Sequence, residues 1–89
     1  MTDELSGLMI NNEKYEQDLY YIGQYLQISR NELGLDIEDV VLMTQVPSQW
    51  IEMAEKGQDI PRFARDILVR FFDYIASYNH ISSLRKNVA

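Results

Sequence analysis

The sequence contains no cysteine, only two prolines and a single histidine, His80. The lack of cysteine excludes disulfides and thiolate metal sites, and one histidine cannot form a histidine cluster around a metal. No apolar run approaches the roughly 20 residues that are needed to span a bilayer. The acidic start of the chain, residues 1–4, is unlike the basic start of a signal peptide. We therefore expect a soluble, unprocessed, cytoplasmic protein with no membrane partner and no metal or other cofactor.

Positive charge is also scarce, because eight Lys and Arg residues stand against fourteen Asp and Glu residues, a net charge of −6. Affinity for nucleic acid rests largely on Lys and Arg side chains that neutralise phosphates, so this balance argues against a simple nucleic-acid-binding function. The charge is uneven, however, since residues 61–89 carry five basic and two acidic side chains. Any phosphate contact would therefore depend mainly on the last third of the chain.

The 89 residues of the chain are enough for one domain. Signals for the starts and ends of helices divide this domain into segments. Asn12 can cap a first helix that ends before Gly34, and a second apolar-periodic run begins at Asp36. Pro61 suits the first position of a last helix, whose apolar pattern continues to about Tyr78. The expected helices are 12–33, 36–43, 47–56 and 61–78.

A set of residues between positions 26 and 61 follows a fixed order. They are Leu26, Arg30, Gly34, Leu35, Asp36, Val46, Ile51, Glu55, Gly57 and Pro61. A Leu and an Arg late in a first helix, then Gly-Leu, a polar cap, two short helices, and finally Glu-x-Gly and a Pro resemble the Cro/repressor (XRE-type) helix-turn-helix family over about 40 positions. The resemblance implies an all-α, lambda-repressor-like domain of about five helices, in which the N-terminal and C-terminal helices are long.

This helix-turn-helix domain is expected to cover residues 13–80. Residues 1–12, which contain Gly7 and the pair Asn11-Asn12, are expected to form a flexible lead with an apolar patch at residues 8–10. A strand or turn that packs on the core is an equally good interpretation of this lead. Residues 81–89 are expected to form a tail.

Arg30 and Glu55 occupy positions that pair in the resembled family. The resemblance therefore implies a partly buried ion pair that holds the first helix against the third. A guanidinium suits this role because it can contact a carboxylate and nearby carbonyl groups at once. We expect the pair to be structural. No catalytic residues are expected, because nothing in the sequence suggests a nucleophile with its base or a glycine-rich phosphate loop.

The resemblance implies a DNA-binding function, with the helix at 47–56 in the major groove. The residues expected to face DNA are Ser48, Gln49, Trp50, Glu52, Met53, Lys56 and Arg62. Gln49 can bond the N6 and N7 edge of adenine with both of its amide groups, and Arg62 suits the negative minor groove. The sequence therefore predicts a small prokaryotic or phage transcriptional regulator that binds double-stranded DNA.

Several DNA-facing positions depart from the family pattern. Ile37, Val41, Thr44 and Pro47 replace its usual Gln, Ala, Gly and cap residue, and the acidic pair Glu38-Asp39 stands where a helix start would approach phosphate. A second resemblance accounts for several of these departures. Its residues are Ile37-Glu38-Asp39-Val40, Thr44, Trp50-Ile51-Glu52 and Glu55-x-Gly57. They resemble the cytoplasmic helix-turn-helix of the RodZ family, which binds the bacterial actin MreB instead of DNA. The alternative function is therefore a helix-turn-helix domain adapted to protein–protein interaction, RodZ-like or a phage modulator.

The last helix has a wide apolar arc. Between Phe63 and Tyr78, apolar residues fill close to half of the circumference at about 100° per residue. One small core cannot cover such an arc, so we expect a homodimer or a protein partner to dock on the C-terminal helix. The expected interface consists of Leu68, Val69, Phe72 and Ala76.

Overall fold

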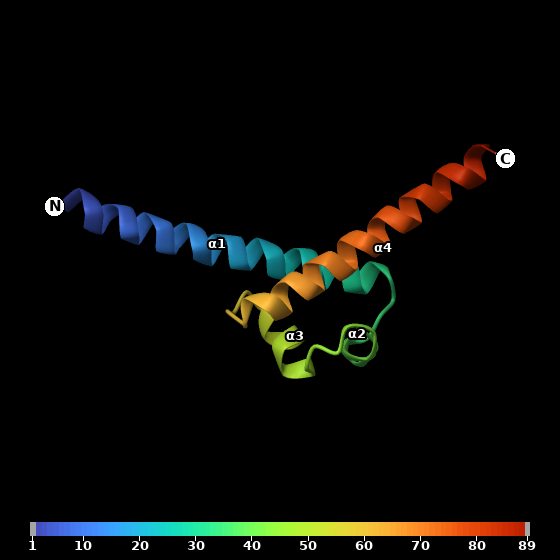
Figure 1. Cartoon of the computed structure of the whole chain (residues 1–89), viewed down its shortest axis with the longest axis horizontal. Coiled ribbons are helices and arrows are strands. Elements are labelled where there is room, and N and C mark those ends of the chain that lie inside the picture. Colours follow the sequence, from blue (N-terminus) through green and yellow to red (C-terminus); the bar gives the residue numbers. More distant parts are fainter. Residues whose placement is uncertain (1, 89) are drawn as a thin grey trace.

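The protein is all-helical in a computed structural model, which describes the backbone of residues 2–88 and the side-chain surroundings of residues 14–78. Residues 2–88 form four helices and no strand (Figure 1). The helices are α1 (Thr2–Glu32), α2 (Ile37–Thr44), α3 (Ser48–Glu55) and α4 (Arg62–Val88). The prediction of an all-α protein is thus confirmed, with four helices in this range where about five were expected.

Both long helices extend beyond their expected limits. α1 begins at Thr2 instead of near Asn12, and α4 continues to Val88 instead of ending near Tyr78. Gly and Asn cost a helix only about 1 kcal/mol or less each relative to Ala, which is too little to end it, whereas proline would. Both prolines lie outside these helices. The side chains of residues 8–10 and of His80 lie outside the described ones.

α1 and α3 end in the same way, at a glycine with positive φ. At the end of α1, Gly34 has φ 69°, its N–H donates to the Asn31 carbonyl, and the Leu35 N–H donates to the Arg30 carbonyl, both at 3.0 Å. Gly57 has φ 79° after α3, and the Gly57 and Gln58 N–H groups donate in the same pattern to the carbonyls of residues 54 and 53. This is the Schellman arrangement, which satisfies the last helical carbonyls.

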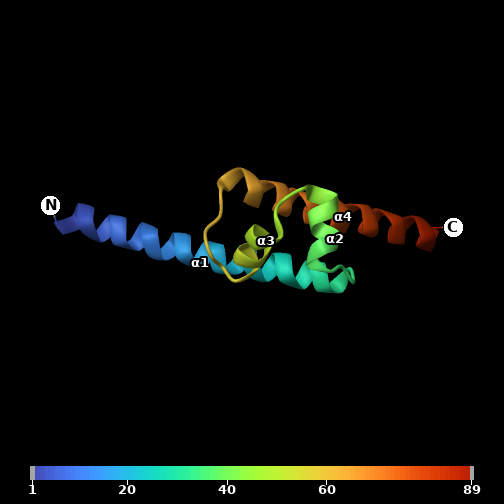
Figure 2. The ribbon, with the colours of Figure 1, turned by 90° about the horizontal axis from the view of Figure 1, so that it is seen from below.

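α2 and α3 form a helix-turn-helix. In Figure 1 α2 is seen nearly along its axis, and in Figure 2 the same is true of α3, so the two helices cross steeply. The residue with positive φ in the turn is Gln45, at 62°, and not Thr44, the position at which the sequence pattern of the resembled family has a glycine. The Thr44 hydroxyl instead closes the turn, because it donates to the Val40 carbonyl at 2.7 Å and accepts from the Val46 N–H at 3.2 Å.

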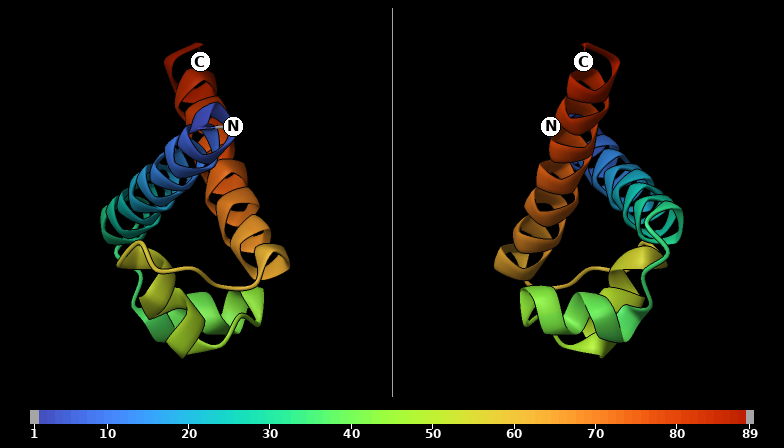
Figure 3. Two further views of the ribbon diagram at one scale, coloured as in Figure 1. Left: turned by 90° about the vertical axis from the view of Figure 1, so that its left-hand side faces the viewer. Right: turned by 90° about the vertical axis from the view of Figure 1, so that its right-hand side faces the viewer.

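The core lies where the four helices meet. Seen end-on, α1 and α4 form two sides of a triangle, and α2 and α3 close its base (Figure 3). The buried cluster draws on every helix and on both connections that flank α3. Its members are Leu26, Val40, Val46, Ile51, Ala54, Ile60, Ala64, Leu68 and Phe72.

α1 and α3 approach each other closely at Gly23. A Cβ atom on this residue would lie 2.4 Å from the Ala54 carbonyl oxygen and 3.0 Å from the carbonyl oxygen of Glu55. Both obstacles are backbone atoms, so neither can rotate away. Gly23 therefore sets how near α3 lies to α1.

The expected interface on α4 is largely occupied by the protein's own core. Leu68 and Phe72 are 0% and 2% exposed, and Val69 is partly buried, so only Ala76 is exposed. The prediction that this set is free for a partner is wrong, because α1, α2 and α3 cover that side of the helix. The apolar side chains left in solvent lie on another face, which begins at Phe63.

Candidate functional site

The third helix has a buried face and an exposed face. Ile51, Ala54 and Glu55 are buried, whereas Gln49 and Glu52 are exposed. Of the other residues expected to face DNA, Lys56 and Arg62 are exposed, and Ser48, Trp50 and Met53 are partly buried. The outer face of α3 therefore presents an amide, a carboxylate and, just past the helix end, an ammonium group.

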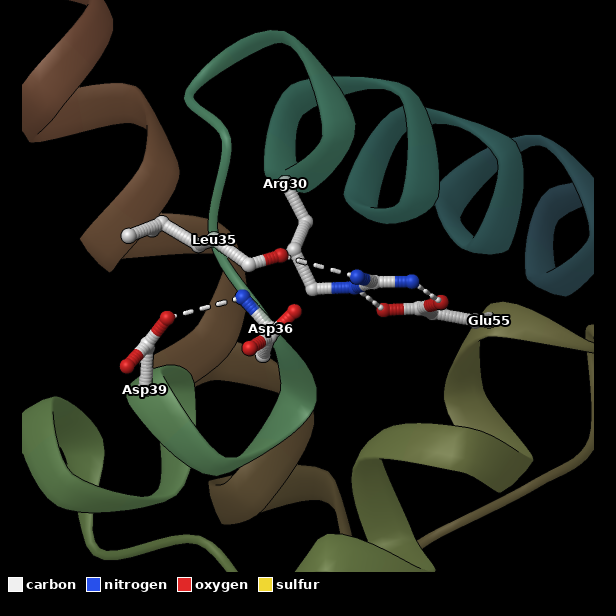
Figure 4. Close-up of polar contacts among 5 residues, drawn as sticks. All are labelled: Arg30, Leu35, Asp36, Asp39 and Glu55. Carbon is white, nitrogen blue, oxygen red and sulfur yellow. Dashed lines mark hydrogen bonds and ion pairs between the residues drawn. The ribbon is translucent and has the colours of Figure 1, made fainter.

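The buried face is held by the Arg30–Glu55 ion pair (Figure 4). Arg30 Nε donates to Glu55 Oε2 at 2.7 Å, and Nη2 donates to Oε1 at 2.9 Å. The remaining nitrogen, Nη1, donates to the Leu35 carbonyl at 2.9 Å. One guanidinium thus joins α1, α3 and the connection that leads into α2, and this fixes the orientation of α3.

This arrangement also affects the charge on Arg30. The hydrogen bonds to the Glu55 carboxylate raise the pKa of Arg30 above its ordinary value. Arg30 therefore stays charged, and each of its three side-chain nitrogens already donates one hydrogen bond within the protein.

The acidic start of α2 has a structural role. The Asp36 N–H donates to Asp39 Oδ2 at 2.9 Å, so Asp39 caps the helix from its first turn (Figure 4). Negative charge at a helix N-terminus is stabilising because it faces the positive end of the helix dipole. Glu38 remains exposed beside this cap, so a phosphate would meet negative charge there.

An aromatic contact links the start of α3 to the start of α4. The rings of Trp50 and Phe63 meet edge to face, with centroids 5.9 Å apart. Their sequence neighbours, Gln49 and Arg62, are both exposed. The contact therefore brings together the two elements that carry the expected base-reading glutamine and the expected minor-groove arginine.

Arg65 is also engaged within the protein. Its Nη1 donates to the Tyr15 hydroxyl at 3.2 Å and to Asp59 Oδ1 at 3.3 Å, and the Tyr15 hydroxyl donates to the same carboxylate at 3.0 Å. The hydrogen bond to Tyr15 raises the pKa of Arg65. These contacts tie the connection between α3 and α4 to α1.

Tyr25 of α1 donates its hydroxyl hydrogen to Asp73 Oδ1 of α4. Desolvation and this bond to a carboxylate raise the pKa of Tyr25 to about 12. The contact joins the two long helices on their polar side, and no sequence pattern marks it, because the two residues are far apart in the chain.

The described residues form no group of three or more metal-ligating side chains. Within the same part of the chain, no helix is both long enough and apolar enough to cross a membrane. Comparison of this chain with protein-family models, with curated proteins and with solved structures found no match. The function of the site is therefore inferred from its geometry.

Proposed function

We propose that this protein is a small, cofactor-free helix-turn-helix regulator that binds double-stranded DNA through the outer face of α3. The observation that carries the proposal is the division of α3, whose inner face is fixed by the core and the Arg30–Glu55 pair while Gln49 and Glu52 stay free. A rigid helix with an exposed polar face behind a tight turn is the form that enters a major groove.

Each exposed side chain has a chemical role in this proposal. Gln49 lies in the first turn of α3 and can bond adenine at N6 and N7, and Glu52 can accept from cytosine N4. Lys56 follows the helix end, where it can contact a backbone phosphate. Arg62, held near by the Trp50–Phe63 contact, can enter the adjacent minor groove.

The charges set the strength of binding. Lys56 and Arg62 are free to neutralise phosphates, whereas Arg30 and Arg65 are paired within the protein. Each phosphate contact adds about −0.9 to the slope of log affinity against log salt. With about two contacts, the expected slope is near −2 and the affinity is modest.

A titration of a labelled duplex pool at low salt tests the proposal. Gln49→Ala is expected to relax the base preference. Arg62→Ala is expected to weaken binding to all sequences and to make the salt slope shallower by about 0.9, the contribution of one phosphate contact. Gln17→Ala, an exposed glutamine on α1, is the matched control and should change neither. The absence of sequence-dependent binding at micromolar protein would overturn the proposal.

The alternative is a helix-turn-helix domain adapted to bind a protein. Exposed Glu38 and Glu52 favour it, because acidic side chains near the groove repel phosphate. The same titration separates the two functions. A protein-binding domain would show no sequence preference, and its response to Gln49→Ala would match that of the Gln17→Ala control.

A further inference from the structure

The outer side of α1 carries a surface without charge. In the end-on view of Figure 3, the other three helices lie on the inner side of α1. Five residues on the outer side, called the α1 face, fall within about 120° of the helix circumference at about 100° per residue. They are Tyr20, Tyr21, Gln24, Gln27 and Ile28. Tyr20, Tyr21 and Ile28 are 56%, 66% and 52% exposed, so the face presents three large side chains to solvent.

The lack of charge on the α1 face matters in a chain with a net charge of −6. Two copies of such a chain repel each other wherever their carboxylates are brought together. Between residues 17 and 31, no Asp, Glu, Lys or Arg lies within the arc of the α1 face. Contact between two α1 faces therefore avoids this repulsion.

We propose that two copies of this chain pair through their α1 faces, with the two helices antiparallel and the two-fold axis at Gln24. The face is symmetric about that residue, because Tyr20 and Ile28 lie at equal distances on either side, as do Tyr21 and Gln27. Tyr21 then packs against the partner's Ile28, and Tyr20 packs against the partner's Gln27. The axis repeats both contacts.

The shape and chemistry of the face suit this register. Tyr20 and Tyr21, whose rings meet edge to face with centroids 5.7 Å apart, border an open hollow on α1. This hollow lies level with the partner's Ile28. Gln24 meets the partner's Gln24, and an amide can both donate to and accept from its own copy.

Charges at the edge of the face select the direction of pairing. Lys14 and Glu32 lie on one edge, because five full helical turns separate them. Both are exposed, and neither forms an ion pair among the side chains of residues 14–78. Antiparallel helices place Lys14 within about 3 Å, along the helix axis, of the level of the partner's Glu32. Parallel helices would instead set Glu32 beside the partner's Arg30, a residue that Glu55 already holds.

The pairing is weak because the surface is small. If each large side chain has about 200 Å² of surface, the exposed fractions of Tyr20, Tyr21 and Ile28 leave roughly 350 Å² in solvent. With about 150 Å² for the two amides, two copies bury roughly 1,000 Å² together, below the range of about 1,200–2,000 Å² for stable interfaces. Dissociation in the micromolar range follows, so the dimers separate on dilution. The inference goes beyond DNA binding, since the α1 face contains no residue that is proposed to contact DNA.

Sedimentation velocity across a dilution series of the full chain tests the pairing. Tyr21→Glu places a carboxylate against the partner's Ile28 and is expected to weaken association at least about tenfold. It should leave the thermal melt of the dilute protein unchanged, because Tyr21 is neither in the buried cluster nor packed against it. Tyr74→Glu is the matched control, a tyrosine that is 72% exposed on α4, and it should associate like the wild type.

Three outcomes of this experiment would overturn the proposal. They are a wild-type chain that stays monomeric up to millimolar concentration, a Tyr21→Glu variant that associates as strongly as the wild type, and a Tyr74→Glu variant that loses association. The last outcome would mean that the contact lies on α4 and not on α1.

The direction of pairing is tested by exchanging the two edge charges. Lys14→Glu and Glu32→Lys are each expected to weaken association several-fold, because each sets like charges side by side at both ends of the interface. The double variant restores opposite charges and should recover the wild-type value within about threefold. A double variant at least as weak as either single variant would contradict the antiparallel pairing.

Discussion

Gly23 lies against the backbone of α3, and a methyl group there would overlap the Ala54 carbonyl oxygen. Gly23→Ala is therefore expected to lower the free energy of unfolding by about 3 kcal/mol, despite the better helix propensity of alanine. Chemical denaturation measures the loss. Gln27→Ala, an exposed position on the same helix, should stay within about 0.5 kcal/mol of the wild type. A stable Gly23→Ala variant would mean that α1 and α3 pack less closely.

The Arg30–Glu55 pair is expected to affect stability more than recognition. Arg30→Met leaves a nearly buried carboxylate without its partner and should cost about 3 kcal/mol. Glu55→Gln should cost less, because an amide oxygen still accepts from the guanidinium. In the double variant the losses should be less than additive, as a double-mutant cycle of denaturant melts would show. Additive losses would mean that the two side chains do not interact.

At this scale the sequence is informative about residues that belong to a spaced pattern. Arg30 and Glu55 stand at positions that the family resemblance pairs, and the structure has them in contact. Gly23 belongs to no such pattern. It matters because it has no side chain at the point where the backbone of α3, far away in the sequence, lies against α1. The same holds for Tyr25 and Asp73, whose contact depends on how α1 crosses α4.

Among the elements, the turn between α2 and α3 holds a strained residue. Gln45 has φ 62°, a conformation that costs a residue with a Cβ about 1–2 kcal/mol and costs glycine little. Gln45→Gly is therefore expected to raise the free energy of unfolding by up to about 1 kcal/mol, after the entropy that glycine gains in the unfolded chain. Gln45→Ala keeps the Cβ and should give no gain in the same thermal melts. Equal stability of the two variants would show that the turn is not strained.

The contact between α1 and α4 predicts a response to alkaline pH. The folded protein holds the Tyr25 proton up to a pKa of about 12, whereas the unfolded chain releases it near the ordinary tyrosine pKa of 10.0. The folded state therefore binds more protons between these values, so this stabilisation is fully present below about pH 10 and is lost as pH rises towards about 12. Tyr25→Phe should flatten the fall in stability measured by urea melts across this range. An unchanged profile would contradict the contact with Asp73.

The periodicity of α4 predicts a helix but does not determine which side of that helix faces the core. The arc of apolar residues on α4 can be read from the sequence, and it is wider than the part of the helix surface that the core buries. Which half the core takes depends on where α1, α2 and α3 meet the helix, and the structure buries Phe72 and exposes Phe63. Phe72→Glu would therefore disrupt the fold, because it would place a carboxylate among the buried residues of the core.

In the whole molecule, the helical class was predictable because proline is confined to the connections and apolar residues recur at helical spacing. The full length of α1 and α4 was not predictable, since weak breakers such as Gly and Asn only lower a propensity. The described core is small, and it occupies the middle of a molecule that measures 63 × 31 × 18 Å. Stability is therefore expected to vary along the long helices.

Amide hydrogen exchange should reveal this gradient. The slowest amides are expected at Leu26, Val40, Ile51 and Leu68, which are buried where the helices meet. Amides of residues 14–17, whose side chains are exposed, should exchange by local opening and at least about tenfold faster. Uniform protection along α1 would mean that a partner or a second copy covers this helix.

Trp50 is the single tryptophan of the chain, and its ring lies edge-on against Phe63 at the junction of α3 and α4. Its fluorescence is therefore an intrinsic optical probe that needs no added label. A duplex in contact with Gln49 would change the environment of the neighbouring indole. A change in emission on adding DNA would therefore report binding in the unmodified protein.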